Sequence, residues 1–514
     1  MKKFFSNFFG FLLFCSISVF GQIVSQTSGN WSNPATWTGG VVPRAADNVI
    51  IADGDTVIID AASISMNNLI VGQGNSGSLK FNTVNSSTMI VNGSITISPN
   101  AEFKVVSRPS SLNPDIVDTL YLNGDLTNNG TLDFRSGSAN SSLVVCNLVL
   151  TGTTNSILTT PTIYGAQGDF NKLFIDKTGG AKVILGSDIF VNGGSSSSPA
   201  SNSGIVFING KVETGNFALV YLGSTEANIS GYSDSSYVIG ALGRGMSNSG
   251  SSSKNFPIGD NKSYELVNVH STTSGSSTGH YVLVRCISGD ANTGSSILSG
   301  GIDKVSQIRY YKIGYHGAPG TSPASTMGFD IFRASYNTDD GVNPGNTDLR
   351  IAISTDDRAT WVAIPQNYVF TTQDTSLPGQ LTDTLSKAIT VNIGSDSIYI
   401  ALARATGTTT NDLGNPTDAK QVSNKNLAIY NLSQNYPNPF NPTTEINFSI
   451  AKAGFVKLTV YNILGEKVKD LINGFMNAGS HSINFNASKL SSGIYLYTIT
   501  TDNFVQTKKM VLLK

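Results

Sequence analysis

Apolar residues along this chain come in short runs that alternate with turn residues. Between about residues 64 and 240 the runs recur, many of them followed by Asn-Gly or other glycine-bearing turns: Leu69-Ile70-Val71, Met89-Ile90-Val91, Leu120-Tyr121-Leu122, Leu173-Phe174-Ile175 and Ile189-Phe190-Val191. Short β-branched runs predict strands, but strands of three residues bury enough apolar surface only when they stack coil upon coil. The pattern therefore predicts a right-handed parallel β-helix over residues 22–240, with the turn asparagines stacked as ladders between coils.

The remainder of the chain predicts longer strands. Residues 241–300 are expected to form a β-strand connection that leads off the stack, and residues 301–404 show the alternation and turn spacing of an immunoglobulin-like β-sandwich. Residues 405–434 are polar and predict a linker, and residues 435–514 predict a second β-sandwich. Because no segment predicts a long amphipathic helix, the expected fold class is all-β: a right-handed parallel β-helix followed by β-sandwich domains.

The N-terminus carries an export signal. Lys2 and Lys3 precede a mostly apolar run over residues 4–20, which predicts a secretory signal peptide over residues 1–21, cleaved between Gly21 and Gln22. Lipidation at Cys15 is disfavoured because Phe14 precedes it, where that peptidase requires a small residue. No later run reaches the roughly eighteen apolar residues of a spanning helix, so we expect no transmembrane helix in the mature chain.

Composition excludes some partners. Only 13% of residues are charged and the formal net charge is −1, against roughly 25% charged residues in typical globular proteins. Without a basic stripe to neutralise phosphates, a nucleic-acid partner is not expected. Cys146 and Cys286 remain after removal of the signal peptide, too few for a disulfide framework.

Two tryptophans mark the start of the predicted β-helix. Trp31, Pro34 and Trp37 precede a β-turn-β segment around Asp53-Gly54-Asp55. In this order they resemble the opening of an extracellular β-rich module named for its eight glycines. We expect the two rings to cover the open end of the strand stack. Stacking of Trp31 and Trp37 on a sugar is the alternative, which makes them weak ligand candidates.

The last eighty residues carry the most specific motif. They begin with Tyr436-Pro437-Asn438-Pro439-Phe440-Asn441-Pro442, continue through Gly465 and through Gly493 with Tyr495, and end in a strand-like run over residues 508–514. The order resembles the C-terminal sorting domain of the type IX (Por) secretion system of Bacteroidetes. The resemblance implies recognition by that machinery and a place outside the cell or on the outer cell surface, reached through the periplasm. A plain adhesive β-sandwich is the alternative.

Motifs that would carry catalysis lack their structural context. Gly72-Gln73-Gly74-Asn75-Ser76-Gly77 has the spacing of dinucleotide-binding glycines, but a strand follows it instead of a helix. Gly275-Ser276-Ser277-Thr278-Gly279 has the spacing of a nucleophile elbow, but it lies in a polar run between strands. The four histidines, His270, His280, His316 and His481, have no ligand-type spacing. We therefore expect no catalytic and no cofactor-binding residue.

Carboxylates leave two questions open. Asp53 with Asp55, Asp339 with Asp340, and Asp356 with Asp357 could bind calcium through turns, although Asp is common in turns for backbone reasons. No metal ligand is assigned, and calcium is the one cofactor left open. A lyase or glycosidase on the β-helix would need carboxylates grouped on one face of consecutive coils, whereas the outward positions along residues 64–240 are expected to be mostly Asn, Ser and Thr, with isolated Asp133, Asp169 and Asp176.

These features predict a secreted or cell-surface, non-catalytic adhesin or binding protein exported by type IX secretion. An extracellular polysaccharide or another cell-surface ligand is the expected partner. The alternatives are a carbohydrate-active enzyme on the β-helix and a structural surface spacer. The ligand and the cleavage or anchoring of the sorting domain are left open.

Overall fold

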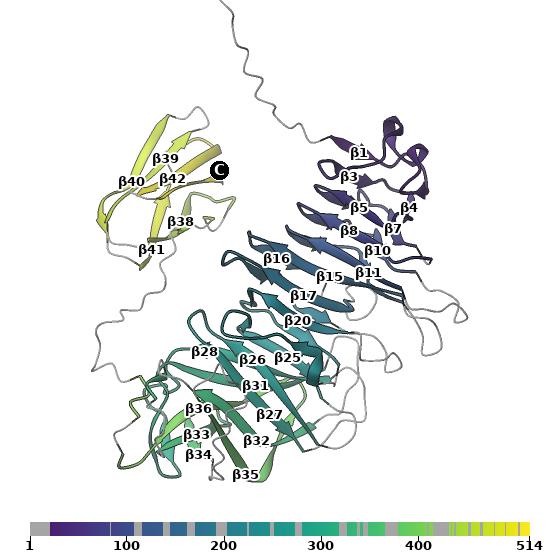
Figure 1. The fold of residues 1–514 in the computed structure, drawn as a ribbon. Coiled ribbons are helices and arrows are strands. Elements are labelled where there is room, and N and C mark those ends of the chain that lie inside the picture. Colours follow the sequence, from purple (N-terminus) through teal and green to yellow (C-terminus); the bar gives the residue numbers. More distant parts are fainter. Residues whose placement is uncertain are drawn as a thin grey trace, which may run out of the picture. The chain divides into compact units, whose positions relative to one another are not determined.

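The chain divides into two compact units, Met1–Asn415 and Pro416–Lys514, which are described separately (Figure 1). The computed structural model describes residues 21–82, 84–106, 116–136, 144–161, 170–191, 203–223, 226–246, 251–272, 280–317, 326–336, 340–342, 348–364, 379–408, 411–414, 431–432, 434–435, 438–450, 454–462, 466–476, 479–488, 490–501 and 504–513. Almost all regular structure in these residues is β-strand.

The first unit begins as a β-solenoid of about seven turns. The first sheet contains β1 (Gln22–Val24), β3 (Asn48–Ile51), β6 (Leu69–Val71), β9 (Ile95–Ile97), β12 (Leu126–Asn128), β16 (Ser156–Thr159), β18 (Lys182–Leu185), β21 (Lys211–Glu213) and β24 (Val238–Ile239). The second sheet contains β5 (Ser63–Met66), β8 (Thr88–Val91), β11 (Ile116–Leu122), β15 (Val144–Gly152), β17 (Lys172–Lys177), β20 (Gly204–Asn209) and β23 (Ile229–Ser230), with β14 (Arg135–Ser136) against β15.

Two further sheets close the coils. The third sheet contains β2 (Gly29–Asn30), β4 (Thr56–Ile59), β7 (Ser78–Phe81), β10 (Glu102–Lys104) and β13 (Thr131–Asp133), and the fourth begins with β19 (Ile189–Val191), β22 (Leu219–Tyr221) and β25 (Ala241–Gly245). Short 3-10 turns lie at η1 (Pro34–Thr36), η2 (Thr38–Gly40) and η4 (Glu226–Asn228). Neighbouring coils pair in parallel, as in β6 with β9 and β11 with β15. The predicted parallel β-helical stack is confirmed.

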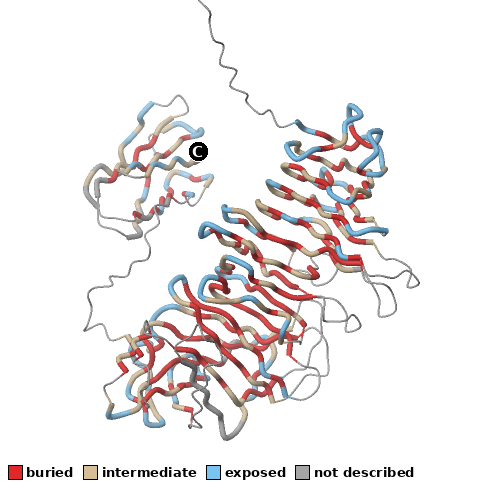
Figure 2. Tube along the Cα trace, viewed as in Figure 1, coloured by how far each residue is buried: buried red, intermediate tan, exposed pale blue. Residues whose placement is uncertain are grey.

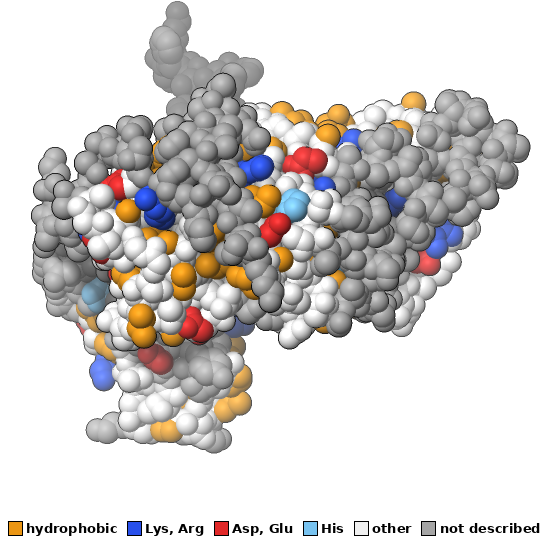
Figure 3. Space-filling model, turned by 90° about the horizontal axis from the view of Figure 1, so that it is seen from below, with side chains coloured by type: hydrophobic (Ala, Val, Ile, Leu, Met, Phe, Trp, Pro, Cys, Tyr) orange, Lys and Arg blue, Asp and Glu red, His pale blue; other side chains and the backbone are white. Residues whose placement is uncertain are grey.

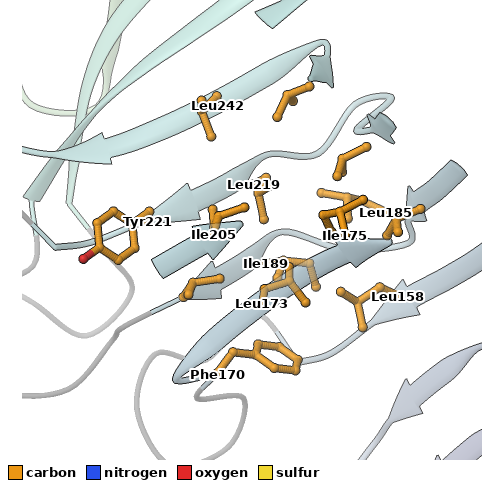
Figure 4. Packing of buried hydrophobic residues seen from close by; sticks show 14 of the residues in the cluster. Leu158, Phe170, Leu173, Ile175, Leu185, Ile189, Ile205, Leu219, Tyr221 and Leu242 are labelled. Atoms are coloured by element: carbon orange, nitrogen blue, oxygen red, sulfur yellow. The ribbon is translucent and has the colours of Figure 1, made fainter. Parts of the chain in front are cut away.

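Inward side chains form a continuous apolar column. Buried and more exposed positions alternate along the strands (Figure 2), as the period of two requires. Four phenylalanines from successive coils contact each other, with ring centroids 5.6 Å apart for Phe81 and Phe103, 5.1 Å for Phe103 and Phe134, and 6.4 Å for Phe134 and Phe170. Farther along, Leu173, Ile205 and Leu219 fill the same interior (Figure 4).

Polar side chains tie the corners of successive coils together. Asn68 Oδ1 accepts a hydrogen bond from the Ser94 N–H at 2.8 Å, and Ser94 Oγ accepts from the Asp125 N–H at 3.0 Å. Asp125 Oδ1 in turn accepts from the Ile157 N–H at 2.8 Å. Asn68 Nδ2 also donates to Asn48 Oδ1 at 2.8 Å. Asparagines of two coils are hydrogen-bonded to each other at this corner, and serine and aspartate take their place on the following coils.

The first and fourth sheets continue without a break into longer strands, most of which pair antiparallel from β26 (Ser252–Gly259) and from β25 onward. The first sheet adds β26, β27 (Tyr264–Ser271), β32 (Thr326–Tyr336) and β35 (Gly379–Asn392). The fourth adds β28 (His280–Ser288), β31 (Arg309–Gly317), β36 (Ser395–Ala405), β33 (Leu349–Ser354), β34 (Thr360–Ala363) and β29 (Ile297–Ser299), with β30 (Ile302–Val305) against β36. Both sheets contribute to the solenoid's apolar cluster, for example through Val269 and Ile313. The immunoglobulin-like sandwich over residues 301–404 stays a prediction.

The second unit has its own two sheets and core. One sheet contains β37 (Asn431–Leu432), β38 (Thr443–Ile450) and β41 (Gly479–Asn486), and the other contains β40 (Lys467–Met476), β39 (Gly454–Asn462), β42 (Gly493–Thr501) and β43 (Phe504–Leu512). Phe448, Leu458, Tyr497 and Met510 are among its buried residues. The all-β class is confirmed for the chain. Among the described residues, no helix is long and apolar enough to cross a membrane.

One inward row of the second sheet is polar. Asp118 faces Cys146 on the next coil, and both side chains are fully buried. Asp118 Oδ1 accepts a hydrogen bond from the Ser87 N–H at 2.7 Å, whereas Asp118 Oδ2 has no hydrogen-bond partner. Because burial disfavours the carboxylate, the pKa of Asp118 is raised to about 7.

The buried Asp118 predicts that the free energy of unfolding of the first unit depends on pH. The pKa of Asp118 rises from 3.8 to about 7 on folding, so the folded chain holds the proton between these values. The free energy of unfolding should therefore fall with rising pH over this interval, by up to about 1.4 kcal/mol per pH unit. Asp118→Asn should match the parent near pH 4 and exceed it at pH 8.

Urea unfolding between pH 4 and 8, followed by tryptophan fluorescence, measures this difference. All three tryptophans, Trp31, Trp37 and Trp361, lie in the first unit. The exposed Asp234→Asn is the matched control and should leave the profile unchanged. Equal slopes for Asp118→Asn and the parent would contradict the assignment.

Candidate functional site

The predicted sorting motif lies along the last strand of the second unit. Asn438 Oδ1 accepts a hydrogen bond from the Val511 N–H at 2.8 Å. The Phe440 N–H donates to Val511 O at 3.0 Å, and the Leu513 N–H donates to Phe440 O at 3.0 Å. Because β43 is the edge strand of its sheet, these bonds satisfy backbone groups that an edge would leave open.

Buried anchors hold the motif in place. Phe440 is 2% exposed, and its ring centroid lies 6.2 Å from that of Phe485. The Asn435 N–H donates to the Tyr497 hydroxyl at 2.8 Å, and Asn435 Nδ2 donates to Thr444 Oγ1 at 2.9 Å. Burial raises the pKa of Tyr497 to about 12, so this hydroxyl stays protonated. Asn435 and Phe440, at the start of the motif, are therefore an integral part of the second unit.

Other residues of the motif lie close by. Pro442 O accepts from the Ala487 N–H at 2.9 Å, Gly493 opens β42, and the Tyr495 hydroxyl donates to Ser491 O at 2.9 Å. Pro439 lies between Asn438 and Phe440, and the exposed Asn441 precedes Pro442. Tyr436, Pro437 and Gly465 lie outside the described residues.

The predicted cleavage point lies directly before the solenoid. Gly21 O accepts a hydrogen bond from the Asn48 N–H at 2.8 Å, and Gln22 is the first residue of β1. Residues 1–20, which include the predicted signal sequence, lie outside the described residues. Cleavage between Gly21 and Gln22 stays a prediction.

Trp31 and Trp37 pack on each other at the N-terminal end of the stack. They are 1% and 0% exposed, and their ring centroids lie 4.8 Å apart at 71°. Trp37 Nε1 donates to Trp31 O at 2.8 Å. Trp31 also borders a hollow of about 330 Å³ together with Val42 and Pro43. Rings buried to this extent present no face to a sugar, so the geometry favours the capping interpretation.

The structure brings one histidine to a carboxylate sixty residues away. His270 Nδ1 lies 2.5 Å from Asp330 Oδ1, beside an irregularity in the pairing of β27 with β32. Ser253 faces His270 from β26, but no hydrogen bond joins the two side chains. No spacing in the sequence signals this pair, because it depends on strand register. Ser277 lies outside the described residues.

The turn carboxylates considered for calcium accept hydrogen bonds from backbone N–H groups. Asp53 Oδ1 accepts from the Gln73 N–H at 2.6 Å, which lowers the pKa of Asp53. Asp356 Oδ1 accepts from the Thr360 N–H at 2.9 Å, which likewise lowers its pKa. Within the described part of the chain, no group of three His, Cys, Asp or Glu side chains could hold a metal ion. Asp339 is outside that part, and calcium dependence stays an open expectation.

A buried ionic cluster joins the antiparallel strands. The Arg309 guanidinium contacts Glu265, and Arg309 Nε lies 3.2 Å from Asp340 Oδ1. Ser335 Oγ donates to Glu265 Oε2 at 2.7 Å. Burial, together with the Asp340 charge, raises the pKa of Glu265 to about 8. With Arg309, Glu265 and Asp340 at most 2% exposed, the cluster links β27 of the first sheet to β31 of the fourth and is closed to substrates.

Comparisons with known proteins give two domain matches. Residues 434–513 match the secretion system C-terminal sorting domain of the Por type, and residues 36–161 match the G8 domain. No curated protein and no solved structure matches the chain. Both resemblances inferred from motifs are confirmed. The sorting domain directs the chain through the type IX secretion system, out of the cell or to its surface.

The hydrogen bond between Asn438 Oδ1 and the Val511 N–H can be tested with a matched pair of variants. Asn438→Ala removes a hydrogen bond to the edge of β43 and should cost about 1 kcal/mol locally. Hydrogen exchange of β43 in the full chain should speed up about fivefold, and surface display should fall. The exposed Asn484→Ala serves as the control.

Deleting residues 435–514 removes the whole sorting domain and gives the largest expected loss of surface display. The truncated chain should accumulate in the periplasm, as measured by protease accessibility on intact cells. Unchanged surface exposure of the truncated chain would refute the export role. Normal surface display of the Asn438→Ala chain, despite faster hydrogen exchange of β43, would show that the hydrogen bond between Asn438 and Val511 contributes to stability alone.

Proposed function

We propose that the chain is a non-catalytic adhesin or binding protein, which the type IX system exports and whose solenoid contacts extracellular material. The observation that supports this is a run of three threonines in one outward row of the first sheet. Thr96, Thr127 and Thr159 stand side by side in register on β9, β12 and β16. Hydroxyl groups repeated on three consecutive coils suit many weak hydrogen bonds better than one reaction centre.

The distribution of carboxylates on the solenoid argues against a lyase or glycosidase. Asp133 lies in β13 of the third sheet, where its Oδ1 accepts from the Arg135 N–H at 3.2 Å. Asp176 lies in β17 of the second sheet, and its Oδ1 accepts from Asn209 Nδ2 at 2.8 Å. Asp133 and Asp176, on different sheets, do not flank one glycosidic bond, and Glu102, which lies near Asp133 on the third sheet, is paired with Lys104. Asp169 is outside the described residues.

The charge on the surface supports a partner that is not strongly charged. Figure 3 shows a face on which Lys, Arg, Asp and Glu side chains are scattered among polar and apolar ones. The formal net charge of −1 agrees with this distribution. Long-range electrostatic steering of a polyanion or polycation would require a field of one sign.

Retention on a panel of polysaccharides tests the proposal. The exported chain is incubated with insoluble and soluble polysaccharides, and bound protein and new reducing ends are measured together. We expect retention on at least one polymer without new reducing ends. Release of reducing ends would overturn the non-catalytic proposal. Absence of retention, together with unchanged attachment of cells that lack the chain, would favour a structural spacer.

A further inference from the structure

One outward row of the second sheet is apolar over five consecutive coils. Strand pairing places Ile90 beside Tyr121, Tyr121 beside Val149, Val149 beside Phe174, and Phe174 beside Val206. These residues point away from the core, because their neighbours in sequence, such as Leu120 and Leu173, belong to the buried cluster. We call Ile90, Tyr121, Val149, Phe174 and Val206 the apolar ladder.

The ladder is accessible. Tyr121 is 39% exposed, and Ile90, Phe174 and Val206 are partly exposed. Val149 is 7% exposed, which its place between the larger Tyr121 and Phe174 explains. A continuous apolar row on the outside of a secreted protein calls for a partner, whereas single exposed apolar residues do not.

The outward rows of the first and third sheets differ in chemistry. The corresponding row of the third sheet runs Ile58, Lys80, Lys104 and Asp133. On the first sheet, Ile50 and Ile70 are followed by three threonines. Uninterrupted apolar character over five coils is therefore a property of the ladder and not a general consequence of solenoid packing.

Polar side chains border the ladder on both sides. Two residues before it stand Thr88, Thr119, Asn147 and Lys172 in register, and two residues after it stand Asn92, Thr151 and Asp176. Lys172 Nζ lies 5.9 Å from the Phe174 ring centroid, and Asp176 Oδ1 accepts from Asn209 Nδ2 at 2.8 Å. One cation and one anion balance each other across the ladder.

We propose that the apolar ladder binds an uncharged, extended β-linked polysaccharide, whose chain runs along the solenoid axis. This inference rests on the proposed binding function and assigns it a site and a ligand class. The apolar CH faces of the pyranose rings lie on Tyr121, Val149 and Phe174. Their equatorial hydroxyls reach the two bordering rows, where hydroxyl, amide and ammonium groups supply donors and acceptors.

The spacing of the rings favours this occupant. Neighbouring strands lie about 4.8 Å apart, so Tyr121 and Phe174, two coils apart, repeat over roughly 10 Å. This is close to the length of two sugars in an extended β-1,4-linked chain, so the same face of alternate sugars would meet an aromatic ring. A polyanion gains nothing here, because Lys172 is offset by Asp176.

Binding to cellulose and chitin, with alginate as the charged contrast, tests the assignment on the exported full chain. Tyr121→Ala and Phe174→Ala should each weaken retention about tenfold, and together more, because each removes one stacking ring. Tyr121→Phe keeps the ring and should bind as the parent does. Ile58→Ala is the control, since Ile58 is exposed on the third sheet, away from both the ladder and the threonine row. Tryptophan fluorescence verifies that each variant is folded.

The outcomes separate the ladder from the wider proposal. Retention that Tyr121→Ala and Phe174→Ala leave unchanged would overturn the ladder and leave the binding function standing. Retention on alginate alone would overturn the ligand class. If the chain self-associates in sedimentation and the two variants abolish self-association instead of retention, the ladder is an interface between copies and the proposal fails. Absence of retention on every polymer would refute the ladder's ligand, while the attachment of cells tests the wider function.

Discussion

Many strands of the solenoid have only three or four residues, so no coil is stable by itself. The rest of the first unit depends on the stacking of these coils. Each coil finds partners for its backbone groups only in the coils before and after it, as β9 does between β6 and β12. Its inward side chains likewise complete an apolar column only with those of its neighbours. The two ends of such a stack need special treatment, since an end coil has a neighbour on one side only.

The chain treats its two ends differently. At the N-terminal end, Trp31 and Trp37 belong to the apolar cluster and pack edge to face, and Trp37 Nε1 donates to Trp31 O. At the other end, β24 and β25 pass the first and fourth sheets on to antiparallel strands, so the open edge is extended. Arg309 and its carboxylates lie inside this extension, where they join the two layers.

Periodicity explains how much could be predicted from the sequence. The short runs before Asn-Gly turns are a local signal, and they predict parallel coils and hydrogen bonds between turn asparagines. The sorting motif is equally local, because it begins with a continuous run of residues that includes Asn438 and Phe440. Which outward residues meet across coils is not local. The register that aligns Tyr121 with Val149 depends on turn lengths that vary from coil to coil. The approach of His270 to Asp330 depends on the register between the antiparallel strands β27 and β32.

The same register that builds the core also builds the surface. Once Leu120, Leu148 and Leu173 align inside, the residue next to each of them in its strand must align outside. Each coil then contributes one outward residue at the strand spacing. A solenoid thus repeats any outward side chain at a fixed interval without a separate packing constraint on it. Outward positions are then free to vary in chemistry while the interior stays apolar. An unbroken outward row such as the apolar ladder is therefore not required by the core, and its explanation has to be sought in what it contacts.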